Sequence, residues 1–331
     1  MTLTAQSIPL SSLASEKHSR LVSFEPSHSW IKRFDDEGIQ IIQAGWKVNP
    51  TGRFFQDDAN PCLIFDGSRR LYGDRVCEGV HVSPLNQRKE DIARYSFAAT
   101  LRPSDDHKDL IVIVSHWHEQ TAADIAQSLL GQYDVTRNGV RIRCTVKRAI
   151  AELEGKGAYY LVKPQLKPGK TLLFELGHGT SEEWIIGSDG WVDGKATENL
   201  AVSRLVDTIA GDQSIRAHCL KLGEQEINRE LISKALRTGQ FGSMPTEHWE
   251  AIKSKYVAVW FDDLKNYLFK AYGSDLQSIS NIVFSGGGAA LIRDRALDFA
   301  IVPDSPETAS VRGAYYHHAA ILAGIPDGEK N

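Results

Sequence analysis

The sequence predicts an α/β protein built from two similar halves, in which mixed sheets are covered by helices. The chain has 331 residues, a length that suits two domains of roughly 150 residues each. Strands followed by helices are expected in both halves. An apolar run that ends in a glutamate and then breaks into small or hydroxyl-bearing residues occurs twice, as SFEPSHSWIK (23–32) and FELGHGTSE (174–182). This repetition indicates a duplicated fold.

The first half contains mainly short strands. Period-two alternation and turn residues predict strands at 20–24, 29–34, 38–43, 62–65, 70–72, 110–115 and 141–146, with a further segment at 159–162. Helices are predicted at 84–99 and 118–130. Residues 163–170 are rich in Pro, Gly and Lys, which marks them as the boundary between the halves. Residues 1–19 are rich in serine, poor in apolar residues and unlike a secretory signal, so we expect a flexible leader.

The second half repeats the strand-turn-strand pattern and then becomes helical. Strands are predicted at 171–176 and 183–187, and helices at 196–209, 215–236 and 246–271. A last buried strand at 281–284 runs into the glycines Gly286, Gly287 and Gly288. Because these positions have no side chain, a flat ring can approach the backbone there, as an adenine pocket requires.

Composition excludes several classes of protein. The formal net charge of −4 argues against a surface that coats nucleic acid, so no direct nucleic-acid binding is expected. The four cysteines are scattered without metal-ligand spacing, which is typical of reduced thiols in a cytoplasmic protein. No apolar run is long enough to span a membrane. His116 and His118 lack a third ligand for zinc, and no GxxxxGK[ST] loop is present.

The two acidic turns have the chemistry of a phosphate site. In open α/β folds ligands collect where strands end, and turns of small residues can direct several backbone N–H groups at one anion. Glu25 and Glu175 precede the turns, within water-bridging reach of a Mg²⁺ carried by the phosphates. Lys32 alternates onto the phosphate-facing side. The residues predicted to surround the phosphates are Ser27, His28, Ser29, Lys32, Gly177, His178, Gly179, Thr180 and Ser181.

The order of these motifs resembles the actin-like ATPase superfamily, most closely its ParM/StbA-type plasmid-segregation branch. FEPSHSWIK resembles the first phosphate loop, FELGHGTSEEWII the second loop with the pattern D-x-G-x-G-T-x-D, and NIVFSGGGAALI the adenosine motif. The tail VPDSPETASVRGAYYHHAAILAG is similar to the closing helix pattern of the family. LYGD (71–74) resembles a hairpin element and EGKGAY (154–159) the inter-domain connector. The resemblance covers residues from about 20 to 323.

The resemblance implies an actin-like (ribonuclease H-like) duplicated fold. Each of two domains would hold a mixed five-stranded sheet flanked by helices, with a nucleotide cleft between them. Domain I would comprise residues 20–165 together with a C-terminal helix at 314–331, and domain II residues 166–313. The implied ligands are ATP (or GTP) and Mg²⁺, with Glu25 and Glu175 holding the metal through water.

The resemblance also assigns catalytic and nucleoside-binding roles. Glu154 aligns with the residue that positions the attacking water, and Glu152 is the near alternative. Lys221 and Glu224 lie where the family contacts ribose and base. Where the family has aspartate, this chain has glutamate at 25 and 175, whose carboxylates reach about 1.5 Å further. Since Mg²⁺ demands near-octahedral geometry, we expect binding with slow hydrolysis, and catalytic roles for Glu25, Glu154 and Glu175.

The implied function is a filament-forming, ATP-binding protein for plasmid or DNA segregation, with slow ATP hydrolysis. Its partners would be further copies of itself, joined head-to-tail, and a DNA-binding adaptor protein. Two alternatives remain: a non-polymerising small-molecule kinase of the same fold, and a degenerate scaffold that only binds nucleotide.

Overall fold

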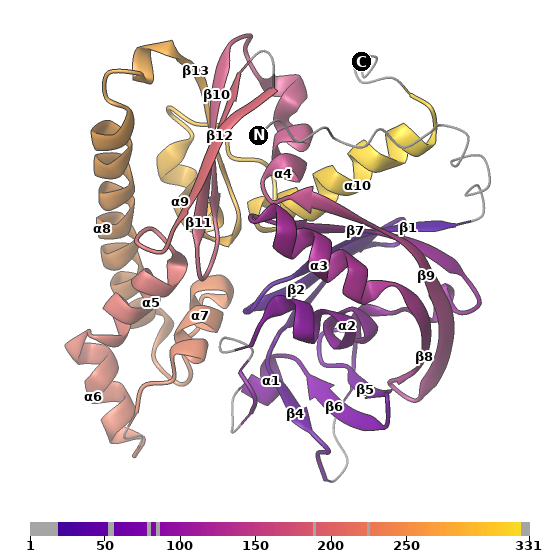
Figure 1. The fold of residues 1–331 in the computed structure, drawn as a ribbon. Coiled ribbons are helices and arrows are strands. Elements are labelled where there is room, and N and C mark those ends of the chain that lie inside the picture. The colour runs from indigo at the N-terminus through magenta and orange to yellow at the C-terminus, as the bar shows by residue number, and fades with distance from the viewer. Residues whose placement is uncertain are drawn as a thin grey trace.

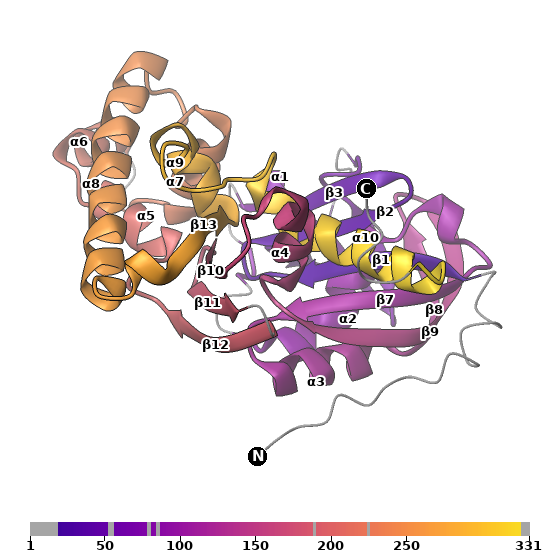
Figure 2. The same ribbon diagram turned by 90° about the horizontal axis from the view of Figure 1, so that it is seen from above.

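The computed structural model describes residues 19–51, 56–77, 81–83, 87–187, 190–223 and 226–325. Within these residues the strands form one sheet of nine and another of four (Figures 1 and 2). Helix α4 (Lys156–Val162) packs on the smaller sheet, α10 (Ala309–Leu322) packs on the larger, and the two helices pack against each other. The predicted leader, apart from residue 19, lies outside the described residues.

The larger sheet has the strand order β3-β2-β1-β7-β9-β8-β5-β6-β4. β1 is antiparallel to β2 and parallel to β7, and β7 is parallel to β9. The strands are β1 (Arg20–Pro26), β2 (Trp30–Asp35), β3 (Gly38–Gln43), β4 (Trp46–Val48), β5 (Cys62–Phe65), β6 (Ser68–Tyr72), β7 (Asp109–His116), β8 (Gly131–Arg137) and β9 (Val140–Leu153).

Helices cover both faces of this sheet. α2 (Lys89–Thr100) and α3 (Glu119–Leu129) pack on one face and α10 on the other, while α1 (Asp74–Cys77) follows β6 (Figure 2). β7 reads as an unbroken apolar run because both of its faces are covered. In β1, Val22 and Phe24 face the core beneath α2, whereas Leu21 packs with Ala314 of α10.

The smaller sheet has the order β12-β11-β10-β13, with β10 parallel to β13. Leu172 and Phe174 face the core formed with the helices of this half, and Leu173 faces α4. The strands are β10 (Lys170–Leu176), β11 (Ser181–Gly187), β12 (Gly190–Thr197) and β13 (Ile279–Ser285), and the helices are α5 (Val202–Ala210), α6 (Gln213–Lys221), α7 (Arg229–Thr238), α8 (Thr246–Tyr272) and α9 (Gly287–Ala296).

The predicted α/β class and the mixed, helix-covered sheets are confirmed, but the strand counts differ from five. The larger sheet continues past β9 because this long strand pairs with β7 and also with β8, which extends the sheet to β5, β6 and β4. In the smaller sheet the fifth strand is reduced to a single parallel bridge between Val283 and Ile301.

Several predicted elements also change. Residues 159–162 belong to helix α4, the predicted helix at 196–209 begins only at 202 because β12 precedes it, and the predicted helix at 215–236 is split into α6 and α7. The C-terminal helix was predicted at 314–331. In the structure α10 begins earlier and ends at Leu322, and residues 326–331 lie outside the described part.

The crossing of α4 and α10 requires glycine on both helices. A Cβ atom at Gly157 would lie 1.8 Å from the Ser310 carbonyl oxygen, and one at Gly313 would lie 1.7 Å from the Gly157 oxygen. The two backbones therefore touch, which fixes the start of α10 beside the end of β10. Among the described helices, none has the length and apolar character needed to cross a bilayer.

Candidate functional site

The first acidic turn lies at the carboxyl end of β1. Glu25 stands directly opposite Lys32 of β2, and Lys32 Nζ donates a hydrogen bond to Glu25 Oε1 at 2.8 Å. Both side chains are buried. Burial opposes the charge of Lys32, but the carboxylates of Glu25, Glu175 and Glu154 outweigh it and raise the pKa of the ammonium. The lysine predicted to face phosphate is thus already paired with a carboxylate.

The second acidic turn lies at the carboxyl end of β10, in the equivalent place. Two hydroxyls donate to Glu175 Oε2, from Ser285 on β13 and from Ser310 on α10 at 3.0 Å. Burial raises the pKa of Glu175 to about 8, and the negative charges of Glu154 and Glu25 add to the effect. The two predicted metal carboxylates therefore share one electrostatic environment, although they come from different sheets.

Glu154 joins this cluster from the end of β9, and Glu152 does not. The Glu154 backbone N–H donates to the His116 carbonyl at 3.1 Å, which holds the turn after β9. Desolvation and the nearby Glu25 raise the pKa of Glu154, although Lys89 and Lys32 oppose the shift. Glu152 is paired elsewhere, with Lys156 at 3.0 Å and with His318 at 3.0 Å. The structure thus places Glu154, of the two alternatives, beside the acidic turns.

Glu182 is a fourth carboxylate that the sequence reasoning missed. It is buried, pairs with Glu175 across β10 and β11, and accepts a hydrogen bond from Thr180 Oγ1 at 2.6 Å. Its Oε2 atom has no hydrogen-bond partner within the described residues. Burial and the charges of Glu154 and Glu175 raise its pKa well above the usual range. The signal was present, because Glu182 stands at the final acidic position of the D-x-G-x-G-T-x-D pattern.

No three His, Cys, Asp or Glu side chains of the described ranges converge closely enough to ligate a metal ion directly. The cluster nevertheless has little positive charge. It holds four carboxyl groups, and among the described residues Lys32 is the one lysine bonded to any of them. Mg²⁺ keeps several of its waters and usually uses one or two carboxylates. The donor set therefore fits an ion held through water by Glu25 and Glu175 better than one bound directly.

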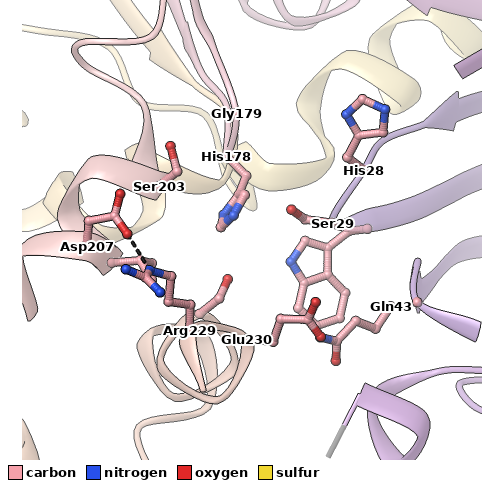
Figure 3. Close-up of a pocket in the computed structure, with 13 residues that line it drawn as sticks. His28, Ser29, Gln43, His178, Gly179, Ser203, Asp207, Arg229 and Glu230 are labelled. Carbon is pink, nitrogen blue, oxygen red and sulfur yellow. Dashed lines mark hydrogen bonds and ion pairs between the residues drawn. The ribbon is translucent and has the colours of Figure 1, made fainter. Parts of the chain in front are cut away.

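A pocket of about 290 Å³ opens between the two halves beside the acidic turns (Figure 3). Figure 3 shows the first-turn residues on one wall and His178, Gly179 and the α5 and α7 residues on the other. Burial lowers the pKa of both His28 and His178. The pocket is lined by His28, Ser29, Trp30, Gln43, Gly45, His178, Gly179, Ser203, Val206, Asp207, Arg229, Glu230 and Ser233.

The remaining turn residues have local roles. The Ser27 hydroxyl accepts the Ser29 N–H at 3.3 Å, and a Cβ at Gly177 would lie 2.4 Å from the Thr180 oxygen, so both turns are tight. The Ser181 hydroxyl is buried and has no hydrogen-bond partner among the described residues. Gly179 is open, with nothing within 4 Å of an added Cβ.

The three glycines after β13 differ from one another. Gly286 has φ +84°, and an added Cβ would lie 2.7 Å from the Leu176 oxygen. A Cβ at Gly288 would lie 2.8 Å from the side chains of Leu176 and Trp260. These two glycines let α9 pack against the end of β10. Only at Gly287 would a Cβ meet nothing within 4 Å, so this is the position open to a ligand.

Of the two predicted nucleoside contacts, Lys221 does not line the pocket. Lys221 is exposed at the end of α6, and Glu224 lies outside the described residues. The wall is formed instead by the first turn of α7, where Arg229 Nε donates to Asp207 Oδ1 at 2.6 Å. A single helix was predicted at 215–236, so the end of α6 was not separated from the first turn of α7.

Helix α7 also bridges the two halves. Lys234 Nζ lies 3.1 Å from Asp74 Oδ2, and Glu230 Oε2 lies 2.7 Å from His81 Nε2. The Arg237 guanidinium stacks over the Trp30 ring at 4.1 Å from its centroid. Because positions 230, 234 and 237 lie on one face of a helix, α7 contacts the first half along its length while its first turn lines the pocket.

No family model matches the sequence, and no curated protein matches it. Solved structures do match. The archaeal actin homolog Ta0583 is 17% identical, with a TM-score of 0.68 over 91% of this chain and 99% of that chain. A 15-stranded ParM filament from Clostridium botulinum is 12% identical, with a TM-score of 0.68 over 91% and 99%. An Alp12 filament structure is 13% identical, with a TM-score of 0.64 over 92% and 99%.

The chain therefore has the actin-like fold of the ParM type, as its motifs predicted. The likeness extends over nearly the whole chain and over nearly the whole of each matched structure. One structure of Ta0583 is a complex with ADP.

Proposed function

We propose that this protein binds ATP between its two halves and assembles into filaments with further copies of itself. The observation that carries the proposal is the convergence of Glu25 and Glu175. They end equivalent strands of two sheets, influence each other's charge and adjoin a pocket with walls from both halves. A structural role alone does not explain why the ends of strands in two separate sheets bring buried carboxyl groups into one cluster, because burying ionisable groups is costly.

The phosphates would lie between the two turns, where small residues leave room for them. The base and the sugar would extend toward Gly287 and the first turn of α7. Glu25 and Glu175 would hold Mg²⁺ through water, and the ion would supply positive charge to the phosphates. The ADP complex of Ta0583, a protein of the same fold, supports a nucleotide as the ligand. The contacts to the base would determine whether GTP can bind in place of ATP.

Slow hydrolysis is part of the proposal. Glu154 would accept a proton from water as its oxygen attacks the terminal phosphorus, and the bond to the ADP oxygen would break. The raised pKa of Glu154 makes it a stronger base, but also leaves less of it ionised near neutral pH. The longer glutamates at 25 and 175 would displace the metal from the position that aspartates give it. Both effects favour slow turnover.

Filament formation is supported by the matched ParM and Alp12 filaments. A heterologous, head-to-tail contact that does not close on itself generates an open polymer. We propose that the polymer acts in the cytoplasm in plasmid or DNA segregation, through a DNA-binding adaptor protein rather than by direct contact with nucleic acid.

The test combines light scattering, negative-stain imaging and phosphate release across protein concentration, with ATP, ADP and a non-hydrolysable analogue. Polymer is expected above a threshold concentration that ATP lowers relative to ADP. Glu25→Ala and Glu175→Ala should each weaken Mg·ATP binding, with Lys108→Ala as a surface control. Unchanged affinity and turnover in both glutamate variants would overturn the shared site.

The same experiment separates the alternatives. A protein that stays monomeric with all three nucleotides and transfers phosphate to a small acceptor would be a kinase. One that binds ATP without polymer or phosphate release would be a binding scaffold.

A further inference from the structure

Lys89 is a second cation beside the acidic turns, and the motifs did not indicate it. It begins helix α2 and is partly exposed. The chain immediately before it is held against the first turn, because His28 Nε2 lies 3.0 Å from the Gln87 carbonyl oxygen. The start of α2 therefore lies next to the residues that line the pocket on the side of the larger sheet.

The two lysines serve different parts of the cluster. Lys32 is bonded to Glu25 and acts on the charge of Glu175. Lys89 acts on Glu182, and it acts on Glu154 more strongly than Lys32 does. It also acts on the His28 imidazole. Lys89 lies two residues beyond Gln87, whose carbonyl contacts His28, and its charge acts on the predicted water-activating carboxylate, Glu154.

The other cationic groups around the pocket are already engaged or are neutral. Lys32 is paired with Glu25 at 2.8 Å, and Arg229 with Asp207 at 2.6 Å. Burial lowers the pKa of His28 and His178, which disfavours a positive charge on these rings. In the described part of the chain Lys89 Nζ forms neither an ion pair nor a hydrogen bond. It is the cation left available for an anionic ligand.

We propose that Lys89, rather than Lys32, binds the terminal phosphate of ATP. The inference rests on the proposed function, since it assumes a nucleotide between the two turns. A polyphosphate beside four carboxylates needs a nearby positive charge that is not already neutralised, and an ammonium is a common phosphate ligand. The start of α2 lies against the first acidic turn, through the contact between Gln87 and His28, and we therefore assign Lys89 to the terminal phosphate and not to the phosphates nearer the sugar.

The test compares binding of Mg·ATP and Mg·ADP by titration calorimetry in the full-length protein. Lys89→Gln should weaken Mg·ATP binding by roughly tenfold or more, because a charge-assisted hydrogen bond is lost. Binding of Mg·ADP should change by less than about threefold. Lys89→Arg should recover most of the ATP affinity, and Lys108→Gln, on the exposed surface, should match the wild type.

Two readouts separate this role from others. If Lys89 served only to tune Glu154, Lys89→Gln would leave ATP affinity unchanged and shift the pH profile of phosphate release upward, which would overturn the proposal. Equal weakening of ATP and ADP would overturn it as well. Circular dichroism confirms that each variant is folded, and Lys89→Met provides a second neutral variant. If the wild type bound neither nucleotide, the proposed function itself would be wrong. If the wild type bound ATP and Lys89→Gln bound it equally tightly, only the inference about Lys89 would be wrong.

Discussion

The two acidic turns occupy equivalent places in the two halves and neutralise their glutamates in opposite ways. Glu25 is opposed by Lys32, a buried ammonium 2.8 Å away. Glu175 has no cation at that distance among the described residues and is held by the hydroxyls of Ser285 and Ser310. The partner of Glu25 is a charged ammonium, whereas the partners of Glu175 are neutral hydroxyls. Because no cation of the described residues is bonded to Glu175, burial raises its pKa to about 8.

This difference implies that the two turns have different roles in the site. The first turn carries a buried ion pair, in which the surrounding carboxylates raise the pKa of the Lys32 ammonium. The second turn holds a carboxyl that is largely protonated near neutral pH, and a cation that binds there must displace the proton. Glu175, Glu182 and Glu154 are therefore the part of the site that a metal or a change in pH can alter.

The largest expected effect comes from removing the charge of each glutamate in turn. Glu25→Gln leaves Lys32 buried without its partner, so the free energy of unfolding should fall by about 3–5 kcal/mol. Glu175→Gln replaces a carboxyl that is mostly protonated at pH 7 by an amide of the same shape, so it should not lower the free energy of unfolding. Urea unfolding followed by circular dichroism measures both.

The control is the double variant Glu25→Gln with Lys32→Met, which removes both charges of the pair. It should be more stable than Glu25→Gln alone, because no buried ammonium remains. Equal destabilisation by Glu25→Gln and Glu175→Gln would show that the two turns are not electrostatically different.

The second prediction concerns pH. The folded-state pKa of Glu175, about 8, lies above that of an exposed glutamate in the unfolded chain. The folded protein therefore binds the proton more tightly, and its stabilisation is present at low pH and is lost as the pH rises toward 8. Between about pH 5 and pH 8 the wild type should lose on the order of 2 kcal/mol relative to Glu175→Gln. Unfolding at a series of pH values measures the loss, and parallel curves for the two proteins would contradict it.

Much of this arrangement could be predicted from the sequence. The two acidic turns at the ends of β1 and β10 and the glycines after β13 are local patterns, and the structure retains each of them at a strand end. β3 was predicted with its observed bounds because turn residues define both of its ends. The actin-like fold followed from the order of such motifs rather than from any one of them.

What could not be predicted depends on tertiary packing. The continuation of the larger sheet depends on β9 pairing with two neighbours. β12 forms because it pairs with β11, and its last two residues fell within the predicted helix at 196–209. The side chains that interact with the glutamates could not be predicted from the sequence either. Ser310 reaches Glu175 only because glycines let α4 and α10 touch. Lys89 carries no motif, and only the fold brings it to Glu154.

The third prediction tests the hydroxyl clamp on the second turn. Ser310→Ala removes one of the two donors to Glu175 Oε2, and this should lower the free energy of unfolding by about 1 kcal/mol. The loss should be larger at pH 9 than at pH 6, since the hydroxyl favours the ionised carboxylate over the protonated one. In a Glu175→Gln background the pH dependence of the Ser310→Ala effect should disappear. An effect of equal size at both pH values in the wild-type background would mean that the hydroxyl serves packing alone.

The smallest expected effect on stability concerns the contact that keeps the two turns together. Lys234 of α7 lies 3.1 Å from Asp74 of the first half, and both side chains are partly exposed. An ion pair of this kind contributes about 0.5 kcal/mol to folding, because water and salt screen it. Its effect on the site should be larger, since α7 lines the pocket and separating the halves would move one turn away from the other. Asp74→Asn and Lys234→Gln should each weaken Mg·ATP binding severalfold, and the double variant should be no worse than either single one. Additive losses in this cycle would show that each side chain acts independently, and unchanged affinity would show that α7 does not couple the two turns.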